Sequence, residues 1–319
     1  MSILSSEISK AIQLINEEKL IAIPTETVYG LAGNAFSEKA VKSIFELKKR
    51  PHFNPLIVHF HSCNQLEEFA RDIPEKAYLL ANKFWPGSLT LVLKKQPRIP
   101  DLITAGKDTV GLRIPNHPLT LKLLENLDFP VAAPSANPFG SISPTNPNHV
   151  SEYFKNELPF ILDGGPCTNG IESTIIGFEN NNPIIYRLGA LSIEEIENEI
   201  GKVQIINQNE TNPSAPGMLS RHYAPKTKTI VTTEIELVIS KNQGKKIGLI
   251  TFDKIIETNQ IEQTIILSKI GDFKEASSNL YSSMHQLDRL NLDLILIEKL
   301  PDYDLGKSIN DRLARASKN

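Results

Sequence analysis

The sequence predicts an α/β protein with a twisted, mixed, open sheet and a second, smaller α/β domain. Three observations predict this fold class. Short apolar runs alternate with helical periodicity from the first residues, and predicted strands outnumber helices up to residue 206. The composition then changes near residue 207, and a new series of strands and helices follows. The length of 319 residues suits two domains, because domains average about 150 residues.

Each element of the first domain has a local signal. Ser5 or Ser6 is expected to cap the first helix and Ser37 the second, which Pro51 ends, while Pro74 opens the third. The helices are predicted over residues 8–15, 40–47, 74–84 and 118–126. The strands are predicted over residues 20–23, 56–60, 88–93, 109–114, 131–133, 160–162, 174–178 and 184–186.

A linker is expected from residue 207 to residue 228. It begins with NQNETNPSAPG, which has no apolar period and is rich in turn-forming residues. The domains are therefore expected to span residues 1–206 and 229–319. In the second domain we expect strands over 246–252, 264–267 and 292–297 and helices over 273–290 and 305–316.

The composition excludes several classes of protein. There are 34 Lys and Arg against 37 Asp and Glu, a net charge of −3, so a site for a polyanion must be a local patch. Cys63 and Cys167 are too few and too far apart for a disulfide framework or a zinc site. No apolar run approaches the roughly 18 residues of a membrane span, and the N-terminus lacks a signal-peptide core. We expect a soluble, cytoplasmic protein with no membrane partner.

Four loops carry polar residues just beyond predicted strands or helices, where open α/β sheets bind ligands. They cover residues 24–30, 48–56, 133–145 and 162–174, and the standard nucleotide motifs are absent. Each loop also has a simpler explanation as a capped turn, or as basic residues that compensate a helix dipole. Arg113 and Arg187, next to strands, could bind an anion or pair with an internal acid, and His59 could be an ordinary core histidine. Together the loops predict a site for an anionic ligand, with no metal cage built by the protein.

The segments, taken in order, resemble one family. PTETVYGL, KKRP with NPLIVH, FWPGSLTLVL, TVGLRIPNH, AAPSAN, ILDGGPC with ESTI, YRLGAL and HYAP are similar to the YrdC-domain threonylcarbamoyl-AMP synthases. The tail, with LGKSINDRLARAS, resembles the C-terminal domain of the longer members. His52-Phe53 and Lys49 depart from the usual pattern without removing a ligand-contacting residue type. The resemblance implies a YrdC-like sheet with a basic concave face, and a smaller Rossmann-like domain.

The resemblance also implies an activity. L-Threonine, bicarbonate and ATP would give threonylcarbamoyl-adenylate and pyrophosphate, with Mg²⁺ carried by ATP. A downstream transferase complex would pass the threonylcarbamoyl group to the tRNA adenosine beside the anticodon, and a weak tRNA contact is possible. Residues 213–225 would form a lid. The implied threonine-binding residues are Thr27, His59, Arg113, Ala133 and Ser173. The implied ATP-binding residues are Lys48, Arg50, Asn54, Thr109, Ser135, Asn137, Ser143, Arg187 and Tyr223.

Three other functions stay open at this point. A pure RNA-binding module would use the basic face and would bind tRNA without ATP, with steep salt dependence. A carbamoyltransferase role, as in hydrogenase-maturation proteins, would require zinc-finger cysteines and an acylphosphatase module that this sequence lacks. A regulatory protein would bind ATP or an amino acid without turnover, so product formation separates it from a synthase.

Overall fold

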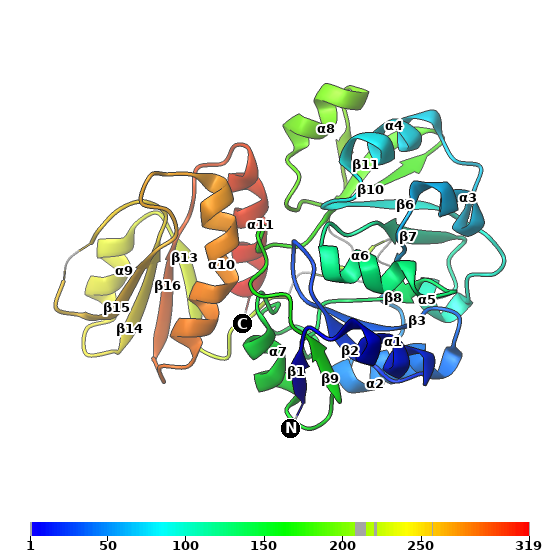
Figure 1. Cartoon of the computed structure of the whole chain (residues 1–319). Coiled ribbons are helices and arrows are strands. Elements are labelled where there is room, and N and C mark those ends of the chain that lie inside the picture. Colours follow the sequence, from blue (N-terminus) through cyan, green and yellow to red (C-terminus); the bar gives the residue numbers. More distant parts are fainter. Residues whose placement is uncertain (1, 208–214, 220–221, 257, 319) are drawn as a thin grey trace.

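The computed structural model describes residues 2–207, 215–219, 222–256 and 258–318. Its strands form two separate sheets, one of twelve strands in the N-terminal part of the chain and one of four strands in the C-terminal part (Figure 1). The larger sheet is mixed, which confirms the predicted fold class. The expected linker of residues 207–228, and the lid within it, include residues 208–214 and 220–221, which lie outside the described residues.

The larger sheet follows the strand order β1-β9-β2-β3-β8-β4-β7-β6-β10-β11-β12, with β5 beside β6. Its strands are β1 (Ile3–Ser5), β2 (Ile21–Ile23), β3 (Gly30–Asn34), β4 (Ile57–His59), β5 (Ala70–Arg71), β6 (Leu89–Lys95), β7 (Thr109–Arg113), β8 (Val131–Ala132), β9 (Phe160–Leu162), β10 (Thr174–Glu179), β11 (Asn182–Arg187) and β12 (Gln204–Ile205). Strands far apart in sequence therefore lie side by side, and the loops that follow them are brought together.

Helices cover this sheet and bury its apolar side chains. The main core joins the helices to the sheet through residues such as Val41, Phe45, Leu80 and Leu91, which are at most 1% exposed. Such burial is the main favourable contribution to folding. The helices are α1 (Ile8–Asn16), α2 (Glu38–Lys48), α3 (Leu66–Phe69), α4 (Glu75–Phe84), α5 (Asp101–Thr104), α6 (Pro118–Glu125), α7 (Pro147–Phe154) and α8 (Ile193–Ile200), with a 3₁₀ turn at Cys63–Gln65.

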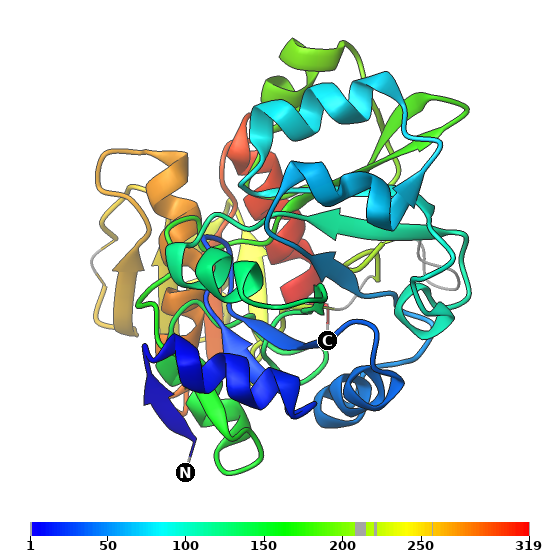
Figure 2. The same ribbon diagram turned by 45° about the vertical axis from the view of Figure 1, so that its right-hand side comes forward.

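The smaller sheet is parallel throughout, in the order β13-β16-β14-β15. Two of its helices, α10 and α11, stand between this sheet and the larger part of the molecule, and α9 lies on the other side (Figures 1 and 2). The strands are β13 (Thr229–Thr232), β14 (Ile247–Thr251), β15 (Ile261–Ile266) and β16 (Leu294–Glu298), and the helices are α9 (Ile235–Lys241), α10 (Phe273–Asp288) and α11 (Leu305–Ala316).

The two parts share a hydrophobic cluster. Val28, Ile142 and Ile171 of the larger part pack with Leu280 and Ile309 of the smaller part in one buried core. A stacked pair of histidine rings, His149 of α7 and His285 of α10, also crosses this boundary, with ring centroids 3.8 Å apart. The smaller part is therefore packed firmly onto the larger one.

The structure corrects several of the local predictions. Glu7, not Ser5 or Ser6, is the N-cap of α1, because residues 3–5 form an unpredicted strand that pairs with β9. Pro74 caps α4 instead of opening its first turn. The strand β3 was missed because GLAGN has low strand propensity, and it forms through pairing with β2 and β8. The helices α7, α8 and α9 and the strand β13 were missed as well, although Ser192 and Glu195 form a capping box at α8.

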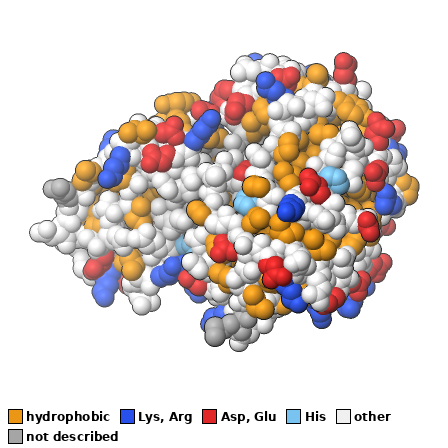
Figure 3. All heavy atoms as spheres, in the orientation of Figure 1, with side chains coloured by type: hydrophobic (Ala, Val, Ile, Leu, Met, Phe, Trp, Pro, Cys, Tyr) orange, Lys and Arg blue, Asp and Glu red, His pale blue; other side chains and the backbone are white. Residues whose placement is uncertain are grey.

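The surface agrees with the small net charge. Acidic and basic side chains are interspersed over the face seen in Figure 3, with apolar side chains between them. Cys167 is buried, as expected for a small apolar residue, whereas Cys63 is partly exposed. Among the described residues, no helix is long and apolar enough to cross a bilayer.

Gly170 lies where the larger part touches α10, so a substitution there tests the contact between the two parts. Its φ is +71°, and a Cβ there would lie 2.4–2.6 Å from backbone atoms of Ser277 and Ser278 in α10. Gly106 has a similar φ of +77° but open space around it. Gly106→Ala is expected to lower the free energy of unfolding by about 1 kcal/mol through backbone strain. Gly170→Ala should lower it by about 2–4 kcal/mol, because overpacking adds to the strain. Urea denaturation measures the free energy of unfolding of both variants. Equal losses would mean that the packing between the two parts accommodates the added methyl group at Gly170 without further cost.

Candidate active site

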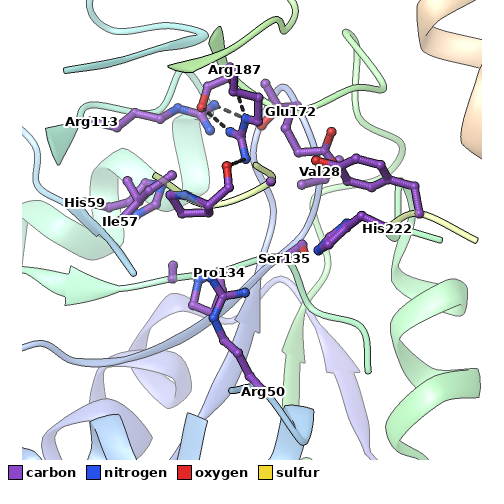
Figure 4. A pocket seen from close by; sticks show the side chains of 16 residues that line it. Val28, Arg50, Ile57, His59, Arg113, Pro134, Ser135, Glu172, Arg187 and His222 are labelled. Atoms are coloured by element: carbon purple, nitrogen blue, oxygen red, sulfur yellow. Dashed lines mark hydrogen bonds between the residues drawn. The ribbon is translucent and has the colours of Figure 1, made fainter. Parts of the chain in front are cut away.

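A central cavity gathers side chains from all four loops singled out in the sequence and from the segment that joins the two parts (Figure 4). Because the cavity is built at strand ends that are distant in sequence, the sheet order determines its composition. Its described lining residues are Thr27, Val28, Arg50, Ile57, His59, Arg113, Ala133, Pro134, Ser135, Glu172, Ser173, Arg187, Pro216, Gly217, His222 and Tyr223.

The first loop, between β2 and β3, is folded by Thr25. The Thr25 hydroxyl accepts from the backbone N–H groups of Thr27 and Val28, at 3.1 and 3.2 Å, and donates to the Val28 carbonyl at 2.7 Å. A hydroxyl that bonds to the backbone two or three residues ahead is typical of a tight turn. The loop is thus both a capped turn and a wall of the cavity, because the turn places Thr27 and Val28 in the lining.

The register of two parallel strands places His59 and Arg113 side by side. β4 and β7 pair so that His59 lies opposite Arg113, and both side chains are nearly buried, at 3% and 4% exposed. Nη2 of Arg113 donates to Oε1 of Glu26 at 2.7 Å and to Oγ1 of Thr27 at 3.0 Å, and Nε donates to the Gly87 carbonyl at 3.1 Å. Within the described residues, these contacts leave Nη1 as the edge available to a ligand.

Glu26 is the internal acid that pairs with Arg113. Burial would raise the pKa of Glu26, but the charge of Arg113 and the backbone N–H of Asn116 lower it below its usual value. Ser88 donates a further hydrogen bond at 2.9 Å. The internal acid expected as one explanation for Arg113 is therefore present, and the other edge of the guanidinium faces the cavity.

The second loop holds Arg50 through backbone carbonyls. Its Nε donates to the Asn54 carbonyl at 3.2 Å and its Nη2 to the Pro55 carbonyl at 2.8 Å. Burial and the charge of Arg187 lower the pKa of Arg50 to about 9, which still leaves it cationic at neutral pH. Carbonyl partners fix the side chain without cancelling its charge, so Arg50 can still bind an anion.

The third loop is fastened by Lys48. This side chain is 1% exposed, at the end of α2, and its ammonium donates to the carbonyls of Ser135 and Asn137. Burial and the nearby Arg50 lower the pKa of Lys48 well below its usual value. Lys48 lies outside the cavity lining, and its contacts hold the loop that carries Ser135 into it.

Arg187 faces the cavity at the end of β11. Its Nε donates to the Ser173 carbonyl and its Nη2 to the Ser173 hydroxyl, both at 3.0 Å, and Ser173 also bonds to Thr90 at 2.7 Å. In Figure 4, Arg187 and Arg113 approach from one side of the cavity and Arg50 from the opposite side. Three guanidinium groups therefore surround one space, which favours a ligand with several negative charges.

Buried polar atoms without partners gather at the cavity. Among the described residues, they include Nδ1 of His59, Nδ1 of His222 and the hydroxyl of Tyr223, all in the lining, and both side-chain polar atoms of nearby Asn54. Buried polar groups normally have hydrogen-bond partners, so this cluster indicates that a polar ligand completes the site. Burial lowers the pKa of His59 and of His222 to about 3, so both rings are neutral at physiological pH.

The comparisons with known proteins agree with this geometry. Residues 13–189 match the family described as "Telomere recombination" and residues 191–318 the family described as "Threonylcarbamoyl-AMP synthase, C-terminal domain". The threonylcarbamoyl-AMP synthase of Pyrococcus abyssi is 43% identical, over 95% of this chain and 92% of the relative, and that of Bacillus subtilis is 37% identical, over 98% and 93%. The chain belongs to the threonylcarbamoyl-AMP synthase family.

Two further comparisons bear on the site and on the domains. P. abyssi Sua5 complexed with L-threonine superposes with a TM-score of 0.93 and 41% identity, over 99% of this chain and 98% of that chain. A shorter relative, the putative threonylcarbamoyl-AMP synthase of Methanocaldococcus jannaschii, is 32% identical over 60% of this chain and 91% of its own length. The family thus includes members whose match covers about 60% of this chain.

Most residues expected from the family resemblance meet in the cavity. Those in the lining are Thr27, Arg50, His59, Arg113, Ala133, Ser135, Ser173, Arg187 and Tyr223. Those outside the lining are Lys48, Asn54, Thr109, Asn137 and Ser143. The structure adds lining residues that the sequence analysis did not name, above all Glu172 and His222, although both lie in motifs quoted for the resemblance, ESTI and HYAP.

The buried histidines predict a loss of stability in mild acid. A histidine whose pKa falls to about 3 in the folded protein stays neutral there, while the unfolded chain binds a proton below about 6.5. Stability is therefore full above pH 6.5 and declines as the pH falls, by about 1–2 kcal/mol per buried histidine between pH 7 and pH 5. Urea denaturation at both pH values measures this.

His222→Gln should reduce that loss by about 1–2 kcal/mol, because glutamine does not titrate. His52→Gln, at an exposed histidine, is the matched control and should leave the loss unchanged. A pH dependence that is the same in wild type and His222→Gln would contradict the assignment of a neutral, buried ring.

Proposed function

We propose that this protein combines L-threonine, bicarbonate and ATP into threonylcarbamoyl-AMP and releases pyrophosphate. The observation that carries the proposal is a cavity with three guanidinium groups, two of them near each other and one opposite, beside buried polar atoms that lack partners. Family membership supports the same reaction. ATP supplies several negative charges and threonine one carboxylate, so the charges of ligands and cavity match.

Threonine binds at the end of the cavity formed by β4 and β7. The free edge of Arg113 takes the carboxylate, and the neighbouring His59 and Thr27 supply polar atoms for the ammonium and hydroxyl groups. Ala133 and Ser173 complete the walls. That a homologous protein was solved with L-threonine supports this assignment.

ATP binds across the rest of the cavity. Arg50 and Arg187 balance the phosphate charge, while Ser135 and Tyr223 present hydroxyl groups in the lining. Asn54 brings polar atoms that lack protein partners within the described residues. Ser143, Thr109 and Asn137 are proposed from the family resemblance and lie outside the described lining, with Ser143 bonded to Glu172. Lys48 contributes indirectly, because it holds the loop that carries Ser135.

The reaction requires little covalent work from the protein. The threonine ammonium first loses a proton to solvent. The free amine then adds to bicarbonate with loss of water, or to carbon dioxide with loss of a second proton, and forms a carbamate. A carbamate oxygen then attacks the α-phosphorus of ATP, and the bond to the β-phosphate breaks as pyrophosphate leaves. Positioning and charge stabilisation by the arginines carry most of such a transfer.

Mg²⁺ enters with ATP and is not held by a protein cage. Glu172 is the one carboxylate among the described lining residues, and both of its oxygens already accept hydrogen bonds. No group of three or more metal-binding side chains occurs in the described part of the chain. A Mg²⁺ ion bound mainly by phosphates and waters is common in nucleotide sites.

The described parts of the linker contribute Pro216, Gly217, His222 and Tyr223 to the cavity wall. A carbamate is short-lived in water, so these residues have a role in excluding solvent around it.

The product would pass, in the cytoplasm, to a transferase complex that modifies the adenosine beside the tRNA anticodon. A weak tRNA contact at the charged surface is part of this proposal.

A drop-out assay tests the reaction. The purified protein is incubated with ATP, Mg²⁺, L-threonine and bicarbonate, and pyrophosphate and the adenylate are followed by mass spectrometry. Pyrophosphate that requires both threonine and bicarbonate, with the threonylcarbamoyl-adenylate mass, is the expected result. Binding of ATP or tRNA without this product would instead support a binding protein.

Arg113→Ala should raise the threonine KM, because the pair between the guanidinium and the threonine carboxylate is lost. The rise should correspond to about 2–4 kcal/mol of binding free energy, lost from the ground state and the transition state alike. Steady-state kinetics at saturating ATP measures this. Arg71→Ala removes an exposed arginine that pairs with Asp108 and is the matched control, with no expected change. An unchanged threonine KM and kcat in Arg113→Ala would remove Arg113 from the site.

A chain that ends at residue 206 should fold but lose most of its activity. The shorter M. jannaschii relative supports folding of the larger part alone, although Val28, Ile142 and Ile171 would lose the core that they share with the smaller part. Circular dichroism checks the fold and the drop-out assay measures turnover. Full activity in this truncation would show that the linker and the smaller part are dispensable for catalysis.

A further inference from the structure

Glu172 presents a carboxylate to a cavity that otherwise carries positive charge. It is 5% exposed and lines the cavity together with Arg50, Arg113 and Arg187. Its Oε1 accepts from the Ser143 hydroxyl at 2.6 Å. A buried carboxylate beside a site for phosphates opposes their binding unless another charge compensates it.

The compensating charge comes from the other part of the molecule. Nε of Arg312, in α11, donates to Oε2 of Glu172 at 2.8 Å, and the hydroxyl of Tyr281, in α10, donates to the same oxygen at 3.0 Å. Arg312 is 1% exposed, and its Nη2 donates to the Leu188 carbonyl. Its guanidinium carbon lies 5.0 Å from the centre of the Tyr223 ring, which is in the cavity wall.

We propose that Arg312 is a positioning residue for the ATP site, which it serves by neutralising Glu172 and fixing its orientation. The proposal rests on the proposed function. Arg312 lies outside the cavity lining, yet it offsets negative charge there, because its Nε pairs with the only carboxylate among the described lining residues. Its Nη1 pairs with Asp311 at 2.8 Å, and Arg315 also holds that carboxylate, so Asp311 does not depend on Arg312 alone. The smaller part of the protein thus supplies a charge that the ATP site in the larger part requires.

The groups that face Glu172 support this assignment. Burial alone would raise the pKa of Glu172, but the charges of Arg312 and Arg187 and the hydrogen bonds of Ser143 and Arg312 lower it to about 2. The remaining titratable groups that face it are Tyr281, Tyr223 and His222. Without Arg312, an ionised Glu172 would draw Arg187 toward itself and repel the phosphates, whereas Arg113 is held separately by Glu26.

The first experiment compares wild type with Arg312→Met, which keeps much of the side-chain volume and removes the charge. ATP affinity is measured by calorimetry, and the KM values for ATP and threonine by the pyrophosphate assay. We expect ATP affinity to fall by about 10- to 100-fold, with a smaller change in the threonine KM. The thermal midpoint of each variant shows that it is folded.

The rescue variant separates charge from structure. Arg312→Met combined with Glu172→Gln removes both charges of the pair, so we expect it to recover most of the lost ATP affinity. Removal of Arg312 also removes the largest charge that lowers the pKa of Glu172, so this pKa should rise in Arg312→Met. ATP binding by Arg312→Met should therefore improve more than that of wild type as the pH falls, and the double variant should follow wild type, since only the titration of the ATP phosphates is common to all three.

Lys307→Met is the matched control. Lys307 is a cation on the same helix, and it also pairs across the boundary, with Glu194 of α8 at 2.7 Å, but it lies away from the cavity. Its substitution should leave ATP affinity unchanged. An equal loss in Lys307→Met and Arg312→Met would mean that α11 acts only through general docking of the two parts.

Two other outcomes would overturn the proposal. One is unchanged ATP affinity in folded Arg312→Met, and the other is a loss that the second substitution does not relieve. If Arg312→Met does not fold, Arg312→Lys and the double variant provide the comparison, since one keeps the charge and the other removes both. A wild-type protein that binds ATP but makes no adenylate would contradict the proposed function and leave the ATP-binding comparison valid.

Discussion

Each guanidinium in the cavity must be held in place without losing its capacity to bind an anion. Carbonyl oxygens do this for Arg50 and, together with a hydroxyl, for Arg187, because they accept hydrogen bonds and carry no full charge. Glu26 partly neutralises Arg113 and holds one edge of its guanidinium, while the other edge faces the cavity. The remaining carboxylate, Glu172, is compensated from outside the lining by Arg312. The loops, the strand register and the packing of the smaller part together hold these charged side chains in position.

Much of the fold could be predicted from local patterns. The strands β4 and β6 to β11 and the helices α10 and α11 have signals within a few residues of their bounds, because apolar period and turn residues are local properties, whereas the two-residue strand β5 has none. The strand β3 could not be found this way. Its sequence GLAGN has little strand propensity, and it becomes a strand only between β2 and β8, which lie on either side of it in the sheet.

The site, like the fold, has features that the sequence predicts and others that depend on contacts between distant segments. His59 and Arg113 could each be named from the family motifs, but their adjacency comes from the pairing of β4 with β7, which no local pattern specifies. Glu172 stands within ESTI, but the motif does not show where its carboxylate lies, because the partners that hold it, Tyr281 and Arg312, are more than 100 residues away in sequence. Lys48 was expected from the resemblance to bind ATP, and the structure shows its ammonium on the carbonyls of Ser135 and Asn137, outside the described lining, a placement that only the packing of α2 against that loop reveals.

The core shared by Val28 with Leu280 and Ile309 joins the two parts at a sensitive place. Val28 lines the cavity beside Thr27 and belongs at the same time to the core that joins the two parts. Tyr223 has the same double position, so the wall of the cavity and the edge of that core are in part the same side chains. By linkage, a ligand that binds better when the two parts are packed together strengthens that packing by the same factor.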